Sequence, residues 1–151
     1  MKSLHRASLI APCGMNCSIC MVHLRDKNKC VGCRGTNTSK PVTRLRCKIK
    51  TCTVFQKGTA KFCFECTTFP CDKLKHLDKR YRAKYNMSMI ENLENIRDFG
   101  IRQFLRKEAL RWTCSQCAGT ICVHKGYCVD CGKDAPRVSS QITNRYHTHG
   151  R

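Results

Sequence analysis

The middle of the chain has the hydrophobic spacing of a helix. Leu74, Leu77, Tyr81 and Tyr85 recur at intervals of three or four residues, as the apolar stripe of a helix does. Pro70 precedes them, and proline suits the first turn of a helix. The pattern predicts a helix that starts near Pro70.

A second helix is predicted by a capping-box spacing, because Ser88 and Glu91 stand three residues apart just before an apolar run. Gly100 is expected to end this helix, and another short helix is expected to follow. The apolar positions of the two helices are Met89, Ile90, Leu93 and Ile96, then Ile101, Phe104 and Leu105.

The segment 44–58 fits two patterns. Basic and apolar residues alternate from Arg44 to Lys50, which in a strand places the cations on one face. Helical spacing links Leu45, Ile49, Cys52 and Phe55, with Gly58 as the cap. Both readings give a basic surface, formed by Arg44, Arg46, Lys48, Lys50, Lys57 and Lys61.

Composition limits the size of the hydrophobic core. Leu, Ile, Val and Phe make up about a fifth of the 151 residues, and the formal net charge is +19. Fifteen residues are cysteines. Disulfides or metal ions are therefore expected to hold the chain together.

Metal ions fit the sequence better than disulfides. The number of cysteines is odd, and the first twelve residues lack the apolar region of a secretion signal. No run of 18 apolar residues could span a membrane. We expect a reduced, cytoplasmic metal-binding protein with no membrane association.

The cysteines divide the chain into regions. Ten lie in 1–71 and five in 114–131. This distribution predicts a Cys-rich metal-binding region (1–71), a helical segment (72–111), a zinc ribbon (112–132) and a flexible basic tail (133–151). The expected fold class is α+β: a small metal-stabilised fold with zinc knuckles at the N-terminal end, central helices and a C-terminal ribbon.

The C-terminal cysteines have the spacing of a zinc ribbon. Two C-x2-C pairs are separated by ten residues, and two such turns can place four thiolates around one zinc ion. The predicted ligands are Cys114, Cys117, Cys128 and Cys131. Cys122 and His124 lie between the pairs and are interpreted as a buried thiol and an ordinary imidazole, although both are possible ligands.

The N-terminal cysteines can fill two further four-thiolate sites. The simplest pairing puts Cys17, Cys20, Cys30 and Cys33 in one site, and Cys47, Cys52, Cys63 and Cys66 in the other. Cys13 or Cys71 can replace a member of either set. The C-x3-C-x2-C run that Cys13 opens can instead hold three irons of a [4Fe–4S] cluster. About three zinc ions are expected, with the cluster as the alternative.

Three stretches also resemble a known family. The run from Ile10 to Cys20, the Cys30/Cys33 pair and the run from Phe62 to Leu74 are similar to the prokaryotic cysteine-rich family called domain of unknown function 3795. The resemblance covers about residues 8–132 and implies a cytosolic metal-binding protein, without an activity to assign. Similar proteins often carry another cysteine shortly before Cys47, where this chain has Arg44 to Arg46. This departure leaves the second N-terminal ligand set open.

The positive charge indicates an anionic partner. A zinc ion bound by four thiolates carries a net charge of −2, so three such sites lower the formal charge from +19 to about +13. The remaining charge attracts RNA, DNA or an acidic protein. A second basic run, from Lys73 to Lys84, is equally typical of a solvated helix face and of a phosphate-binding one.

No catalytic pattern occurs in the sequence. It lacks a P-loop, a nucleophile elbow, an H-E-x-x-H motif and a dinucleotide-binding glycine pattern. Sites filled by four thiolates support folding rather than chemistry. The sequence favours a zinc-binding module for nucleic acid or another anionic partner over an enzyme. An iron–sulfur or thiol redox protein and a metal-scaffolded protein adaptor remain the alternatives.

Overall fold

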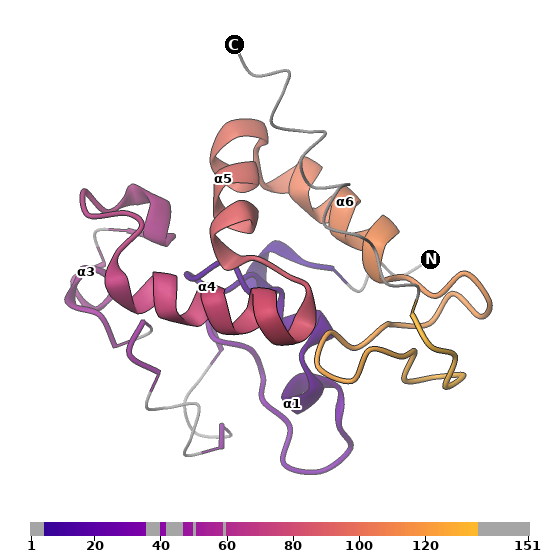
Figure 1. The fold of residues 1–151 in the computed structure, drawn as a ribbon. Coiled ribbons are helices and arrows are strands. Elements are labelled where there is room, and N and C mark those ends of the chain that lie inside the picture. Colours follow the sequence, from indigo (N-terminus) through magenta and orange to yellow (C-terminus); the bar gives the residue numbers. More distant parts are fainter. Residues whose placement is uncertain (1–4, 36–39, 42–46, 50, 59, 136–151) are drawn as a thin grey trace.

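Three consecutive helices connect the two cysteine-rich ends of the molecule (Figure 1). They are α4 (Asp72–Tyr85), α5 (Met89–Phe99) and α6 (Ile101–Trp112). The computed structural model describes residues 5–35, 40–41, 47–49, 51–58 and 60–135. Shorter elements precede the three helices: 3₁₀ turns at Ala7–Leu9, Cys17–Ile19 and Cys63–Glu65, and the one-turn helices α1 (Met21–Leu24) and α3 (Thr53–Gln56).

Helix α4 confirms the predicted apolar stripe. Leu74 and Tyr81 are buried, and Leu77 and Tyr85 pack against the same core. The helix begins at Asp72 with Cys71 as its N-cap, so Pro70 lies before the first turn instead of in it. A turn closed by the Phe69 N–H and the Cys66 carbonyl precedes it (3.1 Å).

Helix α5 has the predicted ends. The Ser88 side chain accepts a hydrogen bond from the Glu91 N–H (3.1 Å), and Gly100 ends the helix with φ 86°. Helix α6 is longer than the short helix expected, because its buried face runs through Phe104, Glu108 and Trp112. The buried carboxyl of Glu108 interrupts the apolar pattern by which the sequence defines that face.

Among the described residues of the segment 44–58, helix occurs at α3, where Cys52 is the N-cap and Gly58 follows the helix end with φ 68°. Residues 42–46 and 50 lie outside the described part of the chain, so neither reading of the basic run is tested there. Most of the predicted flexible tail, 136–151, also lies outside it.

Strand content is low. In the described residues, β structure consists of isolated antiparallel bridges, such as Ile10 with Asn16 and Thr113 with Thr120. The molecule is therefore a small, mainly helical, cysteine-rich fold, and the α+β class is not confirmed. None of the helices described is long and apolar enough to cross a membrane.

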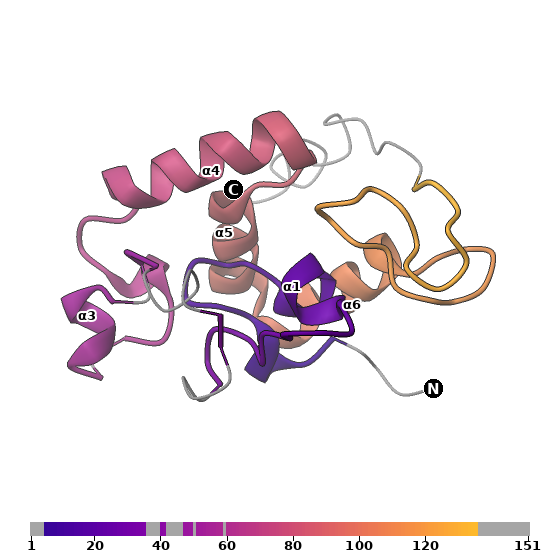
Figure 2. The same ribbon diagram turned by 90° about the horizontal axis from the view of Figure 1, so that it is seen from below.

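One core joins the N-terminal segment, the helices and the C-terminal loop. It contains Ile19 from the first, Leu74 and Leu93 from the helices, and Val123 from the last. Figure 2 shows the N-terminal segment, drawn in indigo, beside α5, and the orange and yellow loop beside the end of α4. The small size of this core agrees with the composition.

Gly14 sets the approach of the N-terminal segment to α5. Its φ is 88°, and a Cβ there would lie 2.8 Å from the Met89 carbonyl oxygen and 2.9 Å from Leu93 Cγ. The Asn92 side-chain amide donates to the Gly14 carbonyl oxygen (3.0 Å). Only glycine fits this backbone conformation and this contact without strain.

Candidate metal centres

The four C-terminal cysteines converge on one point. Their sulfurs all lie within 4.8 Å of one another, with 3.7 Å between Cys114 and Cys131 and 3.6 Å between Cys117 and Cys128. Zinc–sulfur bonds of about 2.3 Å give a tetrahedron with edges of about 3.8 Å. The cysteines Cys114, Cys117, Cys128 and Cys131, here called the C-terminal thiols, therefore could bind a metal ion, and their spacing fits zinc.

Two similar turns build this site. The Ala118 N–H donates to the Cys114 carbonyl, and the Gly132 N–H donates to the Cys128 carbonyl, both at 2.9 Å. Ala118 and Gly132 have φ values of 59° and 75°. Each turn therefore reverses immediately after a C-x2-C pair, which places both of its sulfurs on the inner side.

Backbone N–H groups favour a thiolate in this set. Hydrogen bonds from the backbone of Cys117 and of Gln116 lower the pKa of Cys114 to about 7. The Gly119 N–H lowers the pKa of Cys117, but the neighbouring thiols of Cys128 and Cys131 raise it to about 12. One thiolate therefore forms near neutral pH, and a cation is needed to hold the others close to it.

Cys122 and His124 do not belong to the cluster found among the described residues. Cys122 is fully buried. The Nδ1 atom of His124 accepts from the Met21 N–H (3.3 Å), and Nε2 hydrogen-bonds the Tyr81 hydroxyl (2.9 Å). The imidazole thus joins the C-terminal loop to α1 and α4.

The N-terminal thiols form two looser neighbourhoods. Cys13 interacts electrostatically with Cys33, Cys47 and Cys63, and Cys17 hydrogen-bonds Cys33. The second neighbourhood surrounds Cys63 and contains Cys71, Cys52, Cys66 and Cys47. In the described residues, no three N-terminal sulfurs come within 4.8 Å of one another. The predicted pairing of these cysteines stays a prediction.

Burial keeps several of these thiols protonated. It is the largest cause that raises the pKa of Cys13, followed by the charge of Cys33. For Cys17 the hydrogen bond to Cys33 is the largest cause and burial the next. Burial also raises the pKa of Cys63 to about 12. A metal ion that binds here must therefore displace protons, so its affinity rises with pH.

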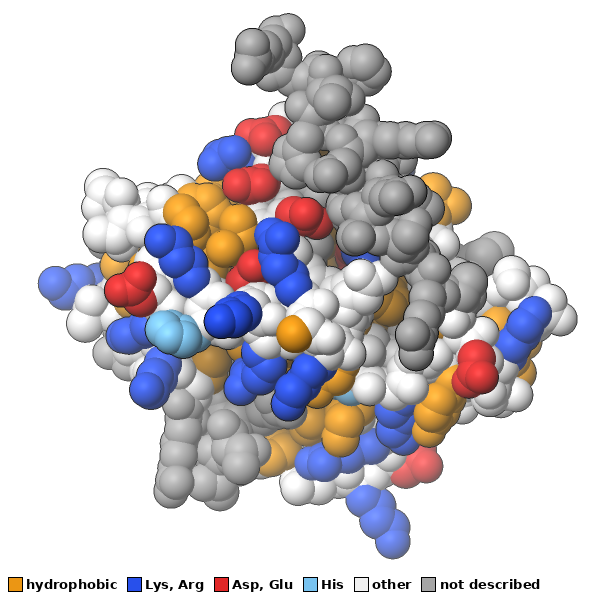
Figure 3. Space-filling model, in the orientation of Figure 1, with side chains coloured by type: hydrophobic (Ala, Val, Ile, Leu, Met, Phe, Trp, Pro, Cys, Tyr) orange, Lys and Arg blue, Asp and Glu red, His pale blue; other side chains and the backbone are white. Residues whose placement is uncertain are grey.

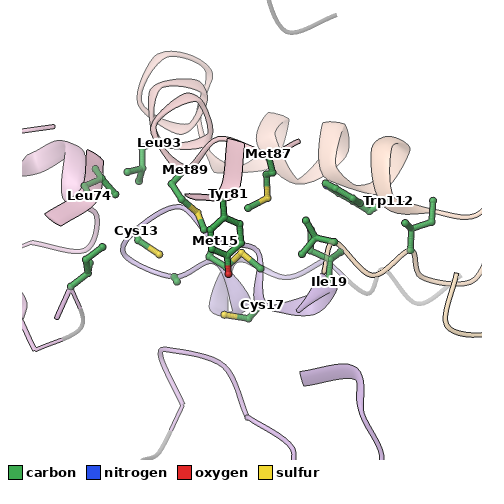
Figure 4. Close-up of a cluster of buried hydrophobic side chains, with 14 of the residues drawn as sticks. Cys13, Met15, Cys17, Ile19, Leu74, Tyr81, Met87, Met89, Leu93 and Trp112 are labelled. Atoms are coloured by element: carbon green, nitrogen blue, oxygen red, sulfur yellow. The ribbon is translucent and has the colours of Figure 1, made fainter. Parts of the chain in front are cut away.

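A cavity of about 800 Å³ lies between the N-terminal cysteines and α4. Four thiols line it, Cys13, Cys30, Cys33 and Cys47, here called the cavity thiols. Figure 4 shows Cys13 and Cys17 on the N-terminal segment, close to the core residues of α4 and α5. The simplest sequence pairing leaves out Cys13 and puts Cys47 in a different site from Cys30 and Cys33, because spacing along the chain cannot show which loops share a cavity.

A cation missed by the sequence analysis lies next to these thiols. Arg34 follows Cys33 directly, and its side chain donates to the carbonyl oxygens of Ile10 (2.7 Å) and Lys61 (2.6 Å). These bonds hold the guanidinium within electrostatic reach of Cys13, Cys17 and Cys33. Its position next to a C-x2-C pair is the signal that could have identified it.

The predicted basic surface is partly described. Lys48, Lys57 and Lys61 are exposed, whereas Arg44, Arg46 and Lys50 lie outside the described residues. The second basic run is described in full on α4, and its cations are exposed. The basic surface that the described residues show is therefore mainly the second basic run, on α4.

Comparison with known proteins finds one family. The chain matches none of the curated proteins and none of the solved structures with which it was compared. The model of the family described as "protein of unknown function (DUF3795)" matches residues 9–76, which hold the ten N-terminal cysteines and the start of α4. The match supports the family that the cysteine pattern of the N-terminal region resembles.

Proposed function

We propose that this protein is a zinc-stabilised module that binds nucleic acid through the outer face of α4. The observation that carries the proposal is the excess of positive charge on that helix. Exposed cations lie along the helix, at Lys73, Lys75, Lys79, Arg80, Arg82 and Lys84. Lys73 and Arg80 also line the cavity beside α4, and Arg82 pairs with Asp78.

Acidic residues of α4 do little to balance this charge. Asp78 is buried, and its carboxylate accepts from Arg82 Nε (2.6 Å), Ser88 Oγ (2.6 Å) and the Ile90 N–H (3.0 Å). It therefore serves the junction between α4 and α5. Each pair of like charges four residues apart, such as Lys75 and Lys79, destabilises a helix by about 0.2–0.5 kcal/mol. A bound polyanion would remove this repulsion.

Helix α5 has a different surface. Its charged residues are mainly acidic, with Glu91, Glu94 and Asp98 beside Arg97. Figure 3 shows the contrast: Lys and Arg side chains gather over α4, and acidic side chains lie toward α5. The cations are thus concentrated on one side, which favours a polyanion that lies along α4.

Zinc at the C-terminal thiols would have a structural role. Four thiolates complete the tetrahedron and leave no position for a substrate. The metal would hold the C-terminal loop, whose His124 contacts Tyr81 and Tyr85 of α4 (ring centroids 5.6 and 4.8 Å apart). In this proposal the zinc supports the end of the helix that binds the partner.

The test is salt-dependent binding to single-stranded RNA and DNA, measured by fluorescence anisotropy between 50 and 200 mM salt. We expect the Lys75→Gln/Lys79→Gln variant to bind about tenfold more weakly, with a salt slope smaller by about two. The matched control is Arg102→Gln/Arg106→Gln, which removes an equally spaced, exposed pair from α6. We expect the control to bind like the original protein.

Two results would contradict the proposal. One is absence of binding at low salt, and the other is equal loss in both double variants, since that would indicate attraction by total charge alone. An acidic protein partner would instead remain bound in a pull-down from nuclease-treated lysate, and Lys75→Gln/Lys79→Gln would release it.

A further inference from the structure

The cavity thiols line a space that is much larger than one metal ion. An ion the size of a water molecule occupies about 30 Å³, whereas the cavity measures about 800 Å³. Its sulfurs come from three separate segments, at Cys13, at the Cys30/Cys33 pair and at Cys47. A group that reaches all four therefore has to extend across the space between these segments.

Sulfur spacing separates this site from the C-terminal one. The C-terminal thiols stand 3.6 and 3.7 Å apart in their closest pairs, as one tetrahedral ion requires. Within the described residues, no three of the cavity thiols approach to within 4.8 Å. One ion therefore does not reach three of these sulfurs where they stand, whereas in a polynuclear centre each thiolate binds a different metal atom.

Charge around the cavity favours an anionic occupant. Lys48, Lys73 and Arg80 line its wall, against the single carboxylate of Asp72. Arg34 is not among the residues that line the cavity, but its guanidinium interacts electrostatically with Cys13 and Cys33. A cluster of iron and sulfide bound by four thiolates carries net negative charge, and neighbouring cations stabilise it.

We propose that Cys13, Cys30, Cys33 and Cys47 bind an iron–sulfur cluster in this cavity. The assignment combines Cys13, the C-x2-C pair and Cys47, instead of the C-x3-C-x2-C run. It leaves Cys52, Cys63, Cys66 and Cys71, which are neighbours around Cys63, as a set for one closed zinc site. The nucleic-acid test changes Lys75 and Lys79, which are not among the residues that line the cavity, so either proposal can fail alone.

The test is metal and sulfide analysis of the full chain purified anaerobically, and of the same protein reconstituted with equal amounts of ferrous and ferric iron and with sulfide. We expect iron and acid-labile sulfide in equal amounts, near four each per chain, together with visible charge-transfer absorption. Reduction with dithionite should give an electron paramagnetic resonance signal. Zinc should remain at the C-terminal thiols.

Two alanine variants at partly buried positions distinguish the ligand sets. Cys47→Ala should lose most of the iron, the sulfide and the visible absorption, whereas Cys20→Ala should keep them, although Cys20 is a ligand in the simplest sequence pairing. Cys13→Ala should behave like Cys47→Ala. Retention of the C-terminal zinc and of the Trp112 fluorescence spectrum shows that each variant is folded.

Three outcomes would overturn the proposal. Zinc near three per chain without iron or sulfide would show mononuclear sites, and absence of iron, sulfide and N-terminal zinc would show that the cavity holds no metal. Loss of the cluster in Cys20→Ala, with retention in Cys47→Ala, would show that a cluster exists on other ligands.

Discussion

The two cysteine-rich ends of the molecule position their sulfurs in different ways. The C-terminal thiols lie within 18 consecutive residues, in two turns whose backbone hydrogen bonds bring them within 4.8 Å. The cavity thiols span residues 13–47 and lie on segments that the core and α4 hold in place. Thiols can therefore be brought together by local turns or by tertiary packing, and only the first kind of grouping is visible as a spacing in the sequence.

The two ends also differ in the protonation of their thiols. Backbone N–H groups lower the pKa of Cys114 to about 7, whereas burial raises the pKa of Cys13 far above its usual value. At neutral pH the C-terminal site is the better prepared to bind a cation. Binding in the cavity has to overcome a larger cost of removing protons.

Removal of a C-terminal ligand should have the largest effect on stability. We expect Cys128→Ser to lose the C-terminal zinc and to lower the free energy of unfolding by at least about 4 kcal/mol, because structural zinc contributes folding energy directly. The matched control is Cys122→Ser, since both thiols are fully buried and only Cys128 belongs to the four-thiol set. We expect the control to keep its zinc and to cost about 1–2 kcal/mol.

Zinc content and urea unfolding followed by Trp112, the single tryptophan, measure both changes. Equal destabilisation of the two variants would mean that burial of the thiol, and not a metal, holds this loop. The contrast between the two ends would then disappear.

A substitution that forces the N-terminal segment away from α5 should have the next largest effect on the free energy of unfolding. Gly14→Ala forces a Cβ to within 2.8 Å of the Met89 carbonyl oxygen at a positive φ, and we expect a loss of about 2–4 kcal/mol. Gly58→Ala is the control, because its φ is also positive but no atom lies within 4 Å of the added Cβ. It should cost about 1 kcal/mol.

The metal content of Gly14→Ala should differ between the two ends of the molecule. If packing positions the cavity thiols, this variant should lose metal from the N-terminal end and keep the C-terminal zinc. Loss of metal from both ends in equal proportion would contradict the distinction between packed and local sites.

The pH dependence of stability that Glu108 causes should be a smaller effect than those of Cys128→Ser and Gly14→Ala. Burial raises the pKa of Glu108, against the opposing effects of the Asn16 hydrogen bond and Arg111. The folded protein therefore retains a proton that the unfolded chain releases, and this contribution to stability falls as the pH rises from about 4.5 through the raised pKa. Glu108→Gln removes that dependence.

His5 lies in the same network and acts in the opposite direction. Its Nδ1 atom hydrogen-bonds Asn16 (2.9 Å) and Ser18 (3.2 Å), and burial lowers its pKa from 6.5, so its contribution to stability falls as the pH drops below that value. Both the original protein and the Glu108→Gln variant contain His5, so its contribution cancels when their free energies of unfolding are subtracted. Urea titrations should show that difference changing by at most about 1.4 kcal/mol per pH unit. A constant difference between pH 4 and 8 would contradict the prediction.

The sequence predicted the features that depend on neighbouring residues. The stripe from Leu74 to Tyr85, the Ser88 cap, Gly100 at the end of α5 and the approach of the four C-terminal thiols all follow from local spacing. The end of α6 was missed, because Glu108 is buried through its hydrogen bond with Asn16, 92 residues earlier in the chain (3.1 Å). A polar residue on a buried face has no local signature.

Local chemistry thus determined the helices and the C-terminal site, since turns and helical periods are completed within a few residues. Tertiary structure alone decided that Cys13 meets Cys33 and Cys47, that Arg34 stands beside them and that Lys73 and Arg80 line the same cavity. The physical reason is that these contacts form when the N-terminal segment, which carries Gly14, packs on α5, while α4 lies across the same core.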